Sequence, residues 1–173
     1  TDDSQITTSY NTNLAQTTGK KMHAPLNGGF GWTVTYGGFS LDMNFSFTVG
    51  NWKVNNDMRY SENPGTFASG NISRKVFDYW KAVGDNPRHP KITEGTFVYS
   101  GDSRLIQNAD FLRLKSISLS YTLPKEVIEQ IGFFEGVRLY GTARNIFTLT
   151  KYEGADPEFS NPISLGGYPP SRQ

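Results

Sequence analysis

An unbroken alternation of apolar and polar residues over 39–49 constrains the fold of this chain more than any other feature. Successive side chains of a strand point to opposite faces, so one face here is entirely apolar and the other entirely polar. Half-buried strands usually keep such a pattern for about five or six residues. This segment keeps it for about twice that length, and a strand that crosses a membrane needs about 9–11 residues.

Composition favours an all-β protein. The 173 residues are 36% hydrophobic and 14% aromatic, and the mean hydropathy is −0.51. A low mean with many aromatic residues is typical of strands whose apolar residues occupy alternate positions. No apolar run is long enough for a transmembrane helix, the absence of cysteine excludes disulfides and thiolate metal sites, and the net charge of +1 gives no argument for nucleic-acid binding.

The alternation predicts four antiparallel strands in up-and-down order, near residues 30–36, 39–50, 111–123 and 137–150. Gly37-Gly38 predicts a two-residue hairpin turn between the first two. Short turns at 37–38 and 124–136 alternate with long loops at 1–29, 51–110 and 151–173. We expect short helices near 72–83, capped by Asn71 or Ser73, and near 125–132, ended by Gly132.

Short turns that alternate with long loops are typical of outer-membrane barrels, whose apolar face points to lipid and whose polar face lines the lumen. The fold class expected is therefore all-β, with up-and-down strands that form part of a large transmembrane β-barrel. Since the smallest barrels have eight strands, the remainder of the same barrel must supply the others. The lipid-facing candidates are Phe39, Leu41, Met43, Phe45, Phe47, Val49, Ile117, Leu119 and Tyr121.

Two placements of Arg113 and Lys115 stay open. Strict alternation from Ile117 places both basic groups outward, at the outer membrane interface. A β-bulge near Lys115 would instead turn Leu112 and Leu114 outward and the basic pair inward. Near the short turns, Tyr36, Phe39 and Tyr121 fit either an aromatic girdle or simple packing at the strand ends.

Several segments resemble one family. Residues 110–124 have the sequence DFLRLKSISLSYTLP, residues 137–152 have VRLYGTARNIFTLTKY, and Asp156-Pro157-Glu158 follows them. Gly28-Gly29-Phe30-Gly31, and Phe77 to Trp80, stand upstream in the matching order. Together they resemble SusC/RagA-type TonB-dependent transporters over most of residues 20–170.

The resemblance implies that residues 1–173 form the C-terminal part of a TonB-dependent receptor barrel of about 22 strands in the outer membrane of Bacteroidetes, with loops on the cell surface. A SusD-like surface lipoprotein would cover the mouth, and TonB would energise uptake of oligosaccharides or peptides through an N-terminal part outside these residues. A plug and a last strand are also expected outside them. Membrane lipid and lipopolysaccharide would surround the barrel.

No catalytic, cofactor-binding or metal-ligating pattern is present, so we expect no enzyme activity and no cofactor. His23 and His89 are isolated, which predicts solvated loop histidines. Asp156 and Glu158 flank a proline in a loop, which favours a structural role over a catalytic carboxylate pair.

The loop aromatics are the candidate contacts for substrate or lid: Trp52, Tyr60, Tyr79, Trp80 and Tyr99. Their faces could stack on sugars or pack within the long loop itself. Arg138 and Arg144 are candidate lumen residues that would set its charge, or would pair with carboxylates of the barrel or plug. The competing hypotheses are a soluble β-sandwich that binds carbohydrate and a passive porin segment.

Overall fold

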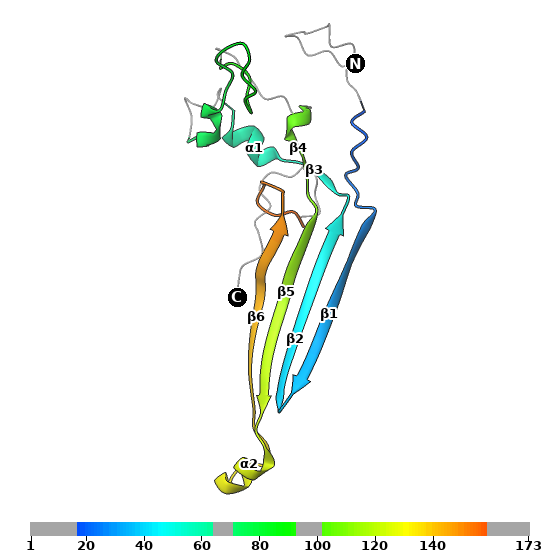
Figure 1. The fold of residues 1–173 in the computed structure, drawn as a ribbon, viewed down its shortest axis with the longest axis vertical. Helices are drawn as coiled ribbons and strands as arrows, with labels where there is room; N and C mark the ends of the chain where they lie inside the picture. Colours follow the sequence, from blue (N-terminus) through cyan, green and yellow to red (C-terminus); the bar gives the residue numbers. More distant parts are fainter. Residues whose placement is uncertain (1–16, 64–70, 93–101, 159–173) are drawn as a thin grey trace.

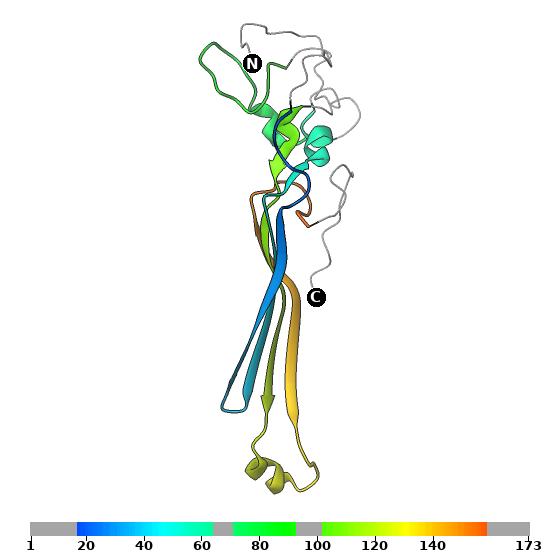
Figure 2. The ribbon, with the colours of Figure 1, turned by 90° about the vertical axis from the view of Figure 1, so that its right-hand side faces the viewer.

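A twisted four-stranded antiparallel sheet dominates the computed structural model, which describes residues 17–63, 71–92 and 102–158 (Figure 1). Its strands are β1 (Leu26–Tyr36), β2 (Phe39–Val49), β5 (Phe111–Thr122) and β6 (Arg138–Thr150). They lie in the order β1-β2-β5-β6. Seen edge-on, the sheet is a single layer, and no described element packs on either face along most of its length (Figure 2).

The hairpin at Gly37-Gly38 sets the register of β1 against β2. Both glycines have positive φ, +55° and +85°, as a two-residue hairpin turn requires. Tyr36 pairs with Phe39 directly beside the turn, and the pairing continues without a slip to Leu26 opposite Val49. This register sets the apolar residues of β1 beside those of β2 on one face.

That apolar face is continuous across all four strands. On β1 and β2, the Phe30 and Phe45 rings stack with centroids 5.0 Å apart, and Phe39 lies 4.3 Å from Tyr121 on β5. The side chains stay largely uncovered, and Trp32 is 59% exposed. The opposite, polar face is joined by hydrogen bonds between Thr33 and Asp42, Asn44 and Ser116, and Ser118 and Thr142.

A β-bulge at Lys115 changes the face of the upper half of β5. Ser116 pairs with Asn44, but Leu114 pairs with Phe45, so Lys115 is an extra residue. Leu112 and Leu114 therefore lie on the apolar face and Arg113 on the polar one. Of the two placements left open by the sequence, the structure has the bulge. The facing part of β6 is also irregular, and Asn145 there has a φ of +51°.

Above the sheet, the described part of residues 51–110 forms a loop assembly. It contains a two-stranded sheet of β3 (Trp52–Val54) and β4 (Ile106–Asn108), α1 (Asn56–Ser61) and the 3₁₀ turns η3 (Arg74–Phe77) and η4 (Ser103–Leu105). Its core is small: Met58 and Leu105 are buried against each other, with Val54 packed beside them. Figure 1 shows the assembly at one end of the sheet and α2 (Lys125–Ile131) at the other.

At the α2 end, the prediction of a short helix is confirmed. Pro124 precedes it, and Gly132 ends it in the left-handed conformation, as glycine commonly does. No helix among the described residues is long and apolar enough to cross a membrane.

Three sequence expectations need correction. The first strand begins at Leu26, so residues 26–29 belong to β1 rather than to a loop. The helix expected over 72–83 is only the 3₁₀ turn Arg74–Phe77, capped by Ser73. The segment 51–110 carries two short strands of its own, β3 and β4, which pair with each other above the main sheet.

The turn glycines provide a paired test of the hairpin. A Cβ at Gly38 would lie 2.8 Å from the Thr122 carbonyl oxygen at a φ of +85°, whereas at Gly37 it would meet nothing within 4 Å. We expect Gly37→Ala to cost about 1 kcal/mol of unfolding free energy through backbone conformation alone. Gly38→Ala should cost more because of the added clash, and urea titrations of both variants measure the difference. Equal losses would contradict the described turn.

Candidate functional site

Arg113 is the centre of a buried ionic cluster on the polar face, where the sheet meets the loop assembly. Its guanidinium donates to Asp156 Oδ1 and Glu158 Oε2, each at 2.7 Å, and its Nε donates to Thr148 Oγ1 at 2.8 Å. The side chains of Arg113 and Asp156 are only 5% and 4% exposed. The cluster ties the segment after β6 back onto β5.

Two lysines extend this cluster. Lys115, the bulge residue, places its Nζ 2.5 Å from Glu158 Oε1, and buried Lys53 on β3 donates to the Pro157 carbonyl oxygen. Burial lowers the pKa of Lys53, opposed by the attraction of Asp156 and Glu158. The prediction of a structural role for Asp156 and Glu158 agrees with these contacts.

A hollow of about 460 Å³ lies beside the cluster, lined by residues that include Ser46, Asn51, Lys53, Phe111 and Glu158. Ser46 Oγ and Asn51 Oδ1 are buried at this hollow without a hydrogen-bond partner among the described residues. An unpaired amide oxygen accepts a hydrogen bond from a hydroxyl or amide group. The hollow therefore offers two unpaired polar atoms beside the charged side chains of Lys53 and Glu158.

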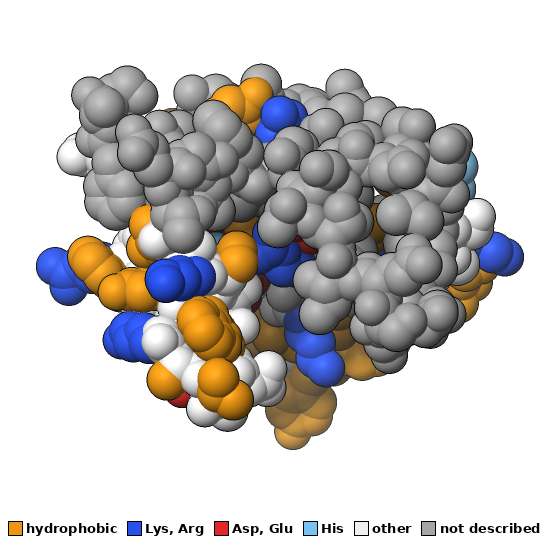
Figure 3. Space-filling view, turned by 90° about the horizontal axis from the view of Figure 1, so that it is seen from above, with side chains coloured by type: hydrophobic (Ala, Val, Ile, Leu, Met, Phe, Trp, Pro, Cys, Tyr) orange, Lys and Arg blue, Asp and Glu red, His pale blue; other side chains and the backbone are white. Residues whose placement is uncertain are grey.

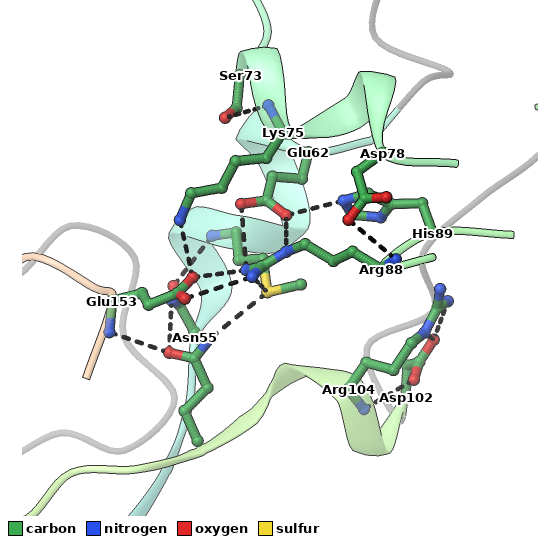
Figure 4. Close-up of polar contacts among 12 residues, drawn as sticks. Asn55, Glu62, Ser73, Lys75, Asp78, Arg88, His89, Asp102, Arg104 and Glu153 are labelled. Atoms are coloured by element: carbon green, nitrogen blue, oxygen red, sulfur yellow. Dashed lines mark hydrogen bonds and ion pairs between the residues drawn. The ribbon is translucent and has the colours of Figure 1, made fainter. Parts of the chain in front are cut away.

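A second ionic network holds the loop assembly together (Figure 4). Arg88 bridges two carboxylates, with Nε 2.9 Å from Glu62 Oε2 and Nη2 2.6 Å from Glu153 Oε2. Lys75 lies 2.9 Å from the same Glu153 oxygen. Hydrogen bonds from Arg88 and then Lys75 lower the pKa of Glu153 to about 2, and the bond with Glu153 raises that of Arg88.

His89 is not the solvated loop histidine expected from the sequence. It is 3% exposed, and its Nε2 lies 3.0 Å from Glu62 Oε2 without a hydrogen bond. Burial lowers the pKa of His89, and Arg88 adds to that shift while Glu62 opposes it. The other histidine, His23, is exposed as expected.

The candidate loop aromatics are not gathered into one site. Trp52 is half-buried with Lys20 Nζ 4.3 Å above its ring, and Tyr60 is 49% exposed beside Arg59. Tyr79 and Trp80 are half-buried near His89. Tyr99 lies outside the described residues.

Arg138 and Arg144 both lie on the polar face of β6, opposite Thr122 and Ser116. Arg138 donates to Ser120 Oγ at 2.7 Å.

Sequence reasoning missed the network of Glu62, Arg88 and Glu153, because its members are far apart in the chain and no local spacing connects them. Seen from the loop end, basic and apolar side chains are interspersed, and acidic ones are barely visible among those described (Figure 3). No group of described residues could hold a metal ion.

Solved structures of the RagAB peptide importer match this fold. In the open-open state, the match has a TM-score of 0.75 and 36% identity over 88% of this chain and 16% of the RagAB chain. The closed-closed state gives the same TM-score, with 34% identity over 91% of this chain and 17% of that one.

Curated relatives give the same result, although no family model matches the chain. TonB-dependent receptor P39 of Formosa agariphila is 25% identical over 78% of this chain. TonB-dependent receptor SusC of Bacteroides thetaiotaomicron is 39% identical over 37% of it. The chain spans only 13% and 6% of these two relatives.

The antiparallel sheet and its structural neighbours define the class: part of the wall of a large transmembrane β-barrel. Within that class, the resemblance to SusC/RagA-type TonB-dependent transporters, expected from the sequence motifs, is confirmed. These relatives are named as receptors and importers.

The buried cluster predicts unequal effects for two neighbouring basic residues. Arg113→Met removes the ion-pair partner of buried Asp156 and leaves it the Glu158 amide and the more distant Lys53, so we expect a loss of about 3 kcal/mol in unfolding free energy. Lys115→Met removes a side chain that is 38% exposed, so we expect a loss of about 1 kcal/mol or less. Denaturant titration of both variants measures these losses. A small effect at Arg113 would show that the cluster is not buried as described.

Acid should weaken the loop assembly in two steps. Below pH 6.5, His89 becomes protonated in the unfolded chain but not in the folded chain, where its pKa is lowered. The free energy of unfolding therefore decreases as the pH decreases. Below pH 4.5 the stabilisation from Glu153 is lost in turn, down to about pH 2. Hydrogen exchange at the Glu62 amide, corrected for intrinsic rates, measures both steps. His89→Gln should remove only the first step, and an unchanged profile would exclude His89 as its source.

Proposed function

We propose that the chain is part of the barrel wall of a SusC-like importer in the bacterial outer membrane. The importer takes up oligosaccharides or peptides together with a SusD-like lipoprotein and with energy from TonB. The observation that carries the proposal is the pair of unlike faces, one continuously apolar and uncovered, the other polar and charged, on a sheet that matches RagAB. The matching RagAB protein is a peptide importer.

The apolar face is assigned to lipid. Its side chains include Phe39, Leu41, Met43, Phe45, Phe47, Val49, Ile117, Leu119 and Tyr121. With a rise of about 3.3 Å per residue, strands of 11 to 13 residues exceed the roughly ten tilted residues that an apolar band about 25 Å tall requires. Tyr36, Phe39 and Tyr121 then lie at the lower edge of that band.

The polar face is assigned to the lumen and the loop assembly to the cell surface. Arg138 and Arg144 then contribute positive charge to the lumen wall. The hollow beside Asn51 opens at the upper end of that wall, where incoming substrate passes. The described aromatic candidates for contact with substrate or the lipoprotein all belong to the loop assembly and keep exposed surface: Trp52, Tyr60, Tyr79 and Trp80.

The soluble β-sandwich is not favoured, because such a fold covers its apolar face with a second sheet. No such sheet lies on this face among the described residues. A passive porin segment would share the barrel wall, but the named relatives are TonB-dependent receptors. Uptake by the full-length protein that persists after loss of TonB would favour the passive pore.

Two adjacent residues test which face meets lipid. On the lipid face near the bilayer midplane, Phe45→Arg should cost about 2–4 kcal/mol and reduce the amount of assembled barrel. Asn44→Arg places the same charge one residue away on the polar face, where it should be tolerated. Heat-modifiable migration of the full-length protein from outer membranes measures assembly. Normal assembly of Phe45→Arg would overturn the assignment.

A further inference from the structure

The hollow of about 460 Å³ on the polar face has the form of a small-molecule site. Its lining includes Ser46 and Thr48 of β2, Phe111 of β5, and Pro157 and Glu158 of the segment after β6. Sites for small molecules usually measure about 300–1,000 Å³ and place a few polar groups around an apolar surface. The hollow is therefore large enough for a small ligand or for one part of a longer one.

Asn51 brings an unsatisfied acceptor to this hollow. Its backbone is fixed on both sides, because its amide donates to Asp110 Oδ1 at 2.8 Å and its carbonyl oxygen accepts from the Ala109 amide at 2.8 Å. The residue is only 6% exposed, and neither its Oδ1 nor Ser46 Oγ has a hydrogen-bond partner among the described residues. Buried polar atoms are nearly always paired, since an unpaired one destabilises the fold. A ligand in the hollow would supply the missing partners.

The charges at the hollow do not select an ionic ligand. The lining carries one cation, Lys53, and one carboxylate, Glu158. Arg113 contacts both Asp156 and Glu158, Lys115 contacts Glu158, and the two carboxylates attract Lys53. Each cation therefore already has a carboxylate beside it, and an anionic ligand would have to compete with these carboxylates.

The arrangement of the lining favours a sugar ring over a peptide. An extended peptide is commonly bound through its main chain at a free sheet edge, but the backbone of β2 is paired on both sides, with β1 and β5. A ligand here meets side chains instead. A sugar hydroxyl both donates and accepts, so neighbouring hydroxyls can donate to Asn51 Oδ1 and exchange hydrogen bonds with Ser46 Oγ. Phe111 adds an aromatic surface for the C–H groups of the ring.

We propose that this hollow is a saccharide subsite, which binds one ring of a neutral oligosaccharide through Asn51 Oδ1, Ser46 Oγ and the ring of Phe111. The inference rests on the proposed function, because that assignment sets the polar face in the lumen, on the path of the substrate. It goes further by assigning an oligosaccharide, and not a peptide, to this site. Asn51 makes the site specific for a ligand that donates a hydrogen bond.

Native mass spectrometry of the full-length protein with linear oligomers of glucose, galactose, mannose and xylose tests the subsite. Asn51→Leu keeps the size of the side chain but removes the acceptor, so affinity should fall about tenfold, and Ser46→Ala should lower it about threefold. Ser40→Ala makes the same change on the same face of β2 outside the hollow. It is the matched control and should bind as the unaltered protein does. Failure of every oligomer to bind, or equal binding by Asn51→Leu, would overturn the proposal.

Two changes of ligand complete the test. The permethylated form of an oligomer that binds has no hydroxyl donor and should bind the unaltered protein with the loss seen for Asn51→Leu. A mixture of short peptides should show no difference between the unaltered protein and Asn51→Leu. Peptide affinity that falls in Asn51→Leu while no oligosaccharide binds would assign the hollow to peptide and overturn the proposal.

An electron cryo-microscopy structure of the full-length protein with a bound oligosaccharide should show a sugar ring beside Asn51. Water alone, or another segment of the protein, in the hollow would overturn the proposal. Heat-modifiable migration checks that both variants assemble, and Ser46→Ala decides if Asn51→Leu does not assemble. If Phe45→Arg blocks assembly while Asn51→Leu and Ser46→Ala bind oligosaccharide normally, the saccharide subsite is wrong and the proposed function stands.

Discussion

One extra residue in β5 determines which side chains of its upper half lie on the apolar face and which on the polar face. Because side chains alternate along a strand, the bulge at Lys115 exchanges the faces of every residue above it on that strand. Without it, Leu112 and Leu114 would interrupt the polar face and Arg113 would interrupt the apolar one. The bulge therefore keeps the apolar face continuous to the loop end and delivers Arg113 to its carboxylate partners.

Ion pairs stabilise the loop assembly and the segment after β6, where apolar packing is sparse. Among the described residues of the loop assembly, the hydrophobic cluster consists of Met58 and Leu105 with Val54 packed beside them, and Val76 and Ala109 are buried outside it. Arg113 and Arg88 compensate, since each joins two carboxylates from distant positions in the chain. Planar, bidentate guanidinium groups suit such bridging.

The sequence predicted the sheet better than the loops. Strict alternation located β2 and the hairpin almost to the residue, since a period of two and a pair of glycines are local signals. The start of β1 was missed because Asn27 and the glycines beside it lack strand propensity and are held by pairing with β2. His89 was misjudged for a similar reason: its burial depends on Glu62 and Arg88, which no local pattern connects with it.

The small core of the loop assembly has a consequence for its motions. A unit with so few buried apolar residues opens with far less free energy than a long, fully paired sheet. It can therefore unfold and refold locally as a separate cooperative unit while the strands below keep their register. Substitutions in the loop assembly would alter its local opening rates and leave the global unfolding transition of the barrel unchanged. The sequence of the loop assembly can therefore vary without destabilising the sheet.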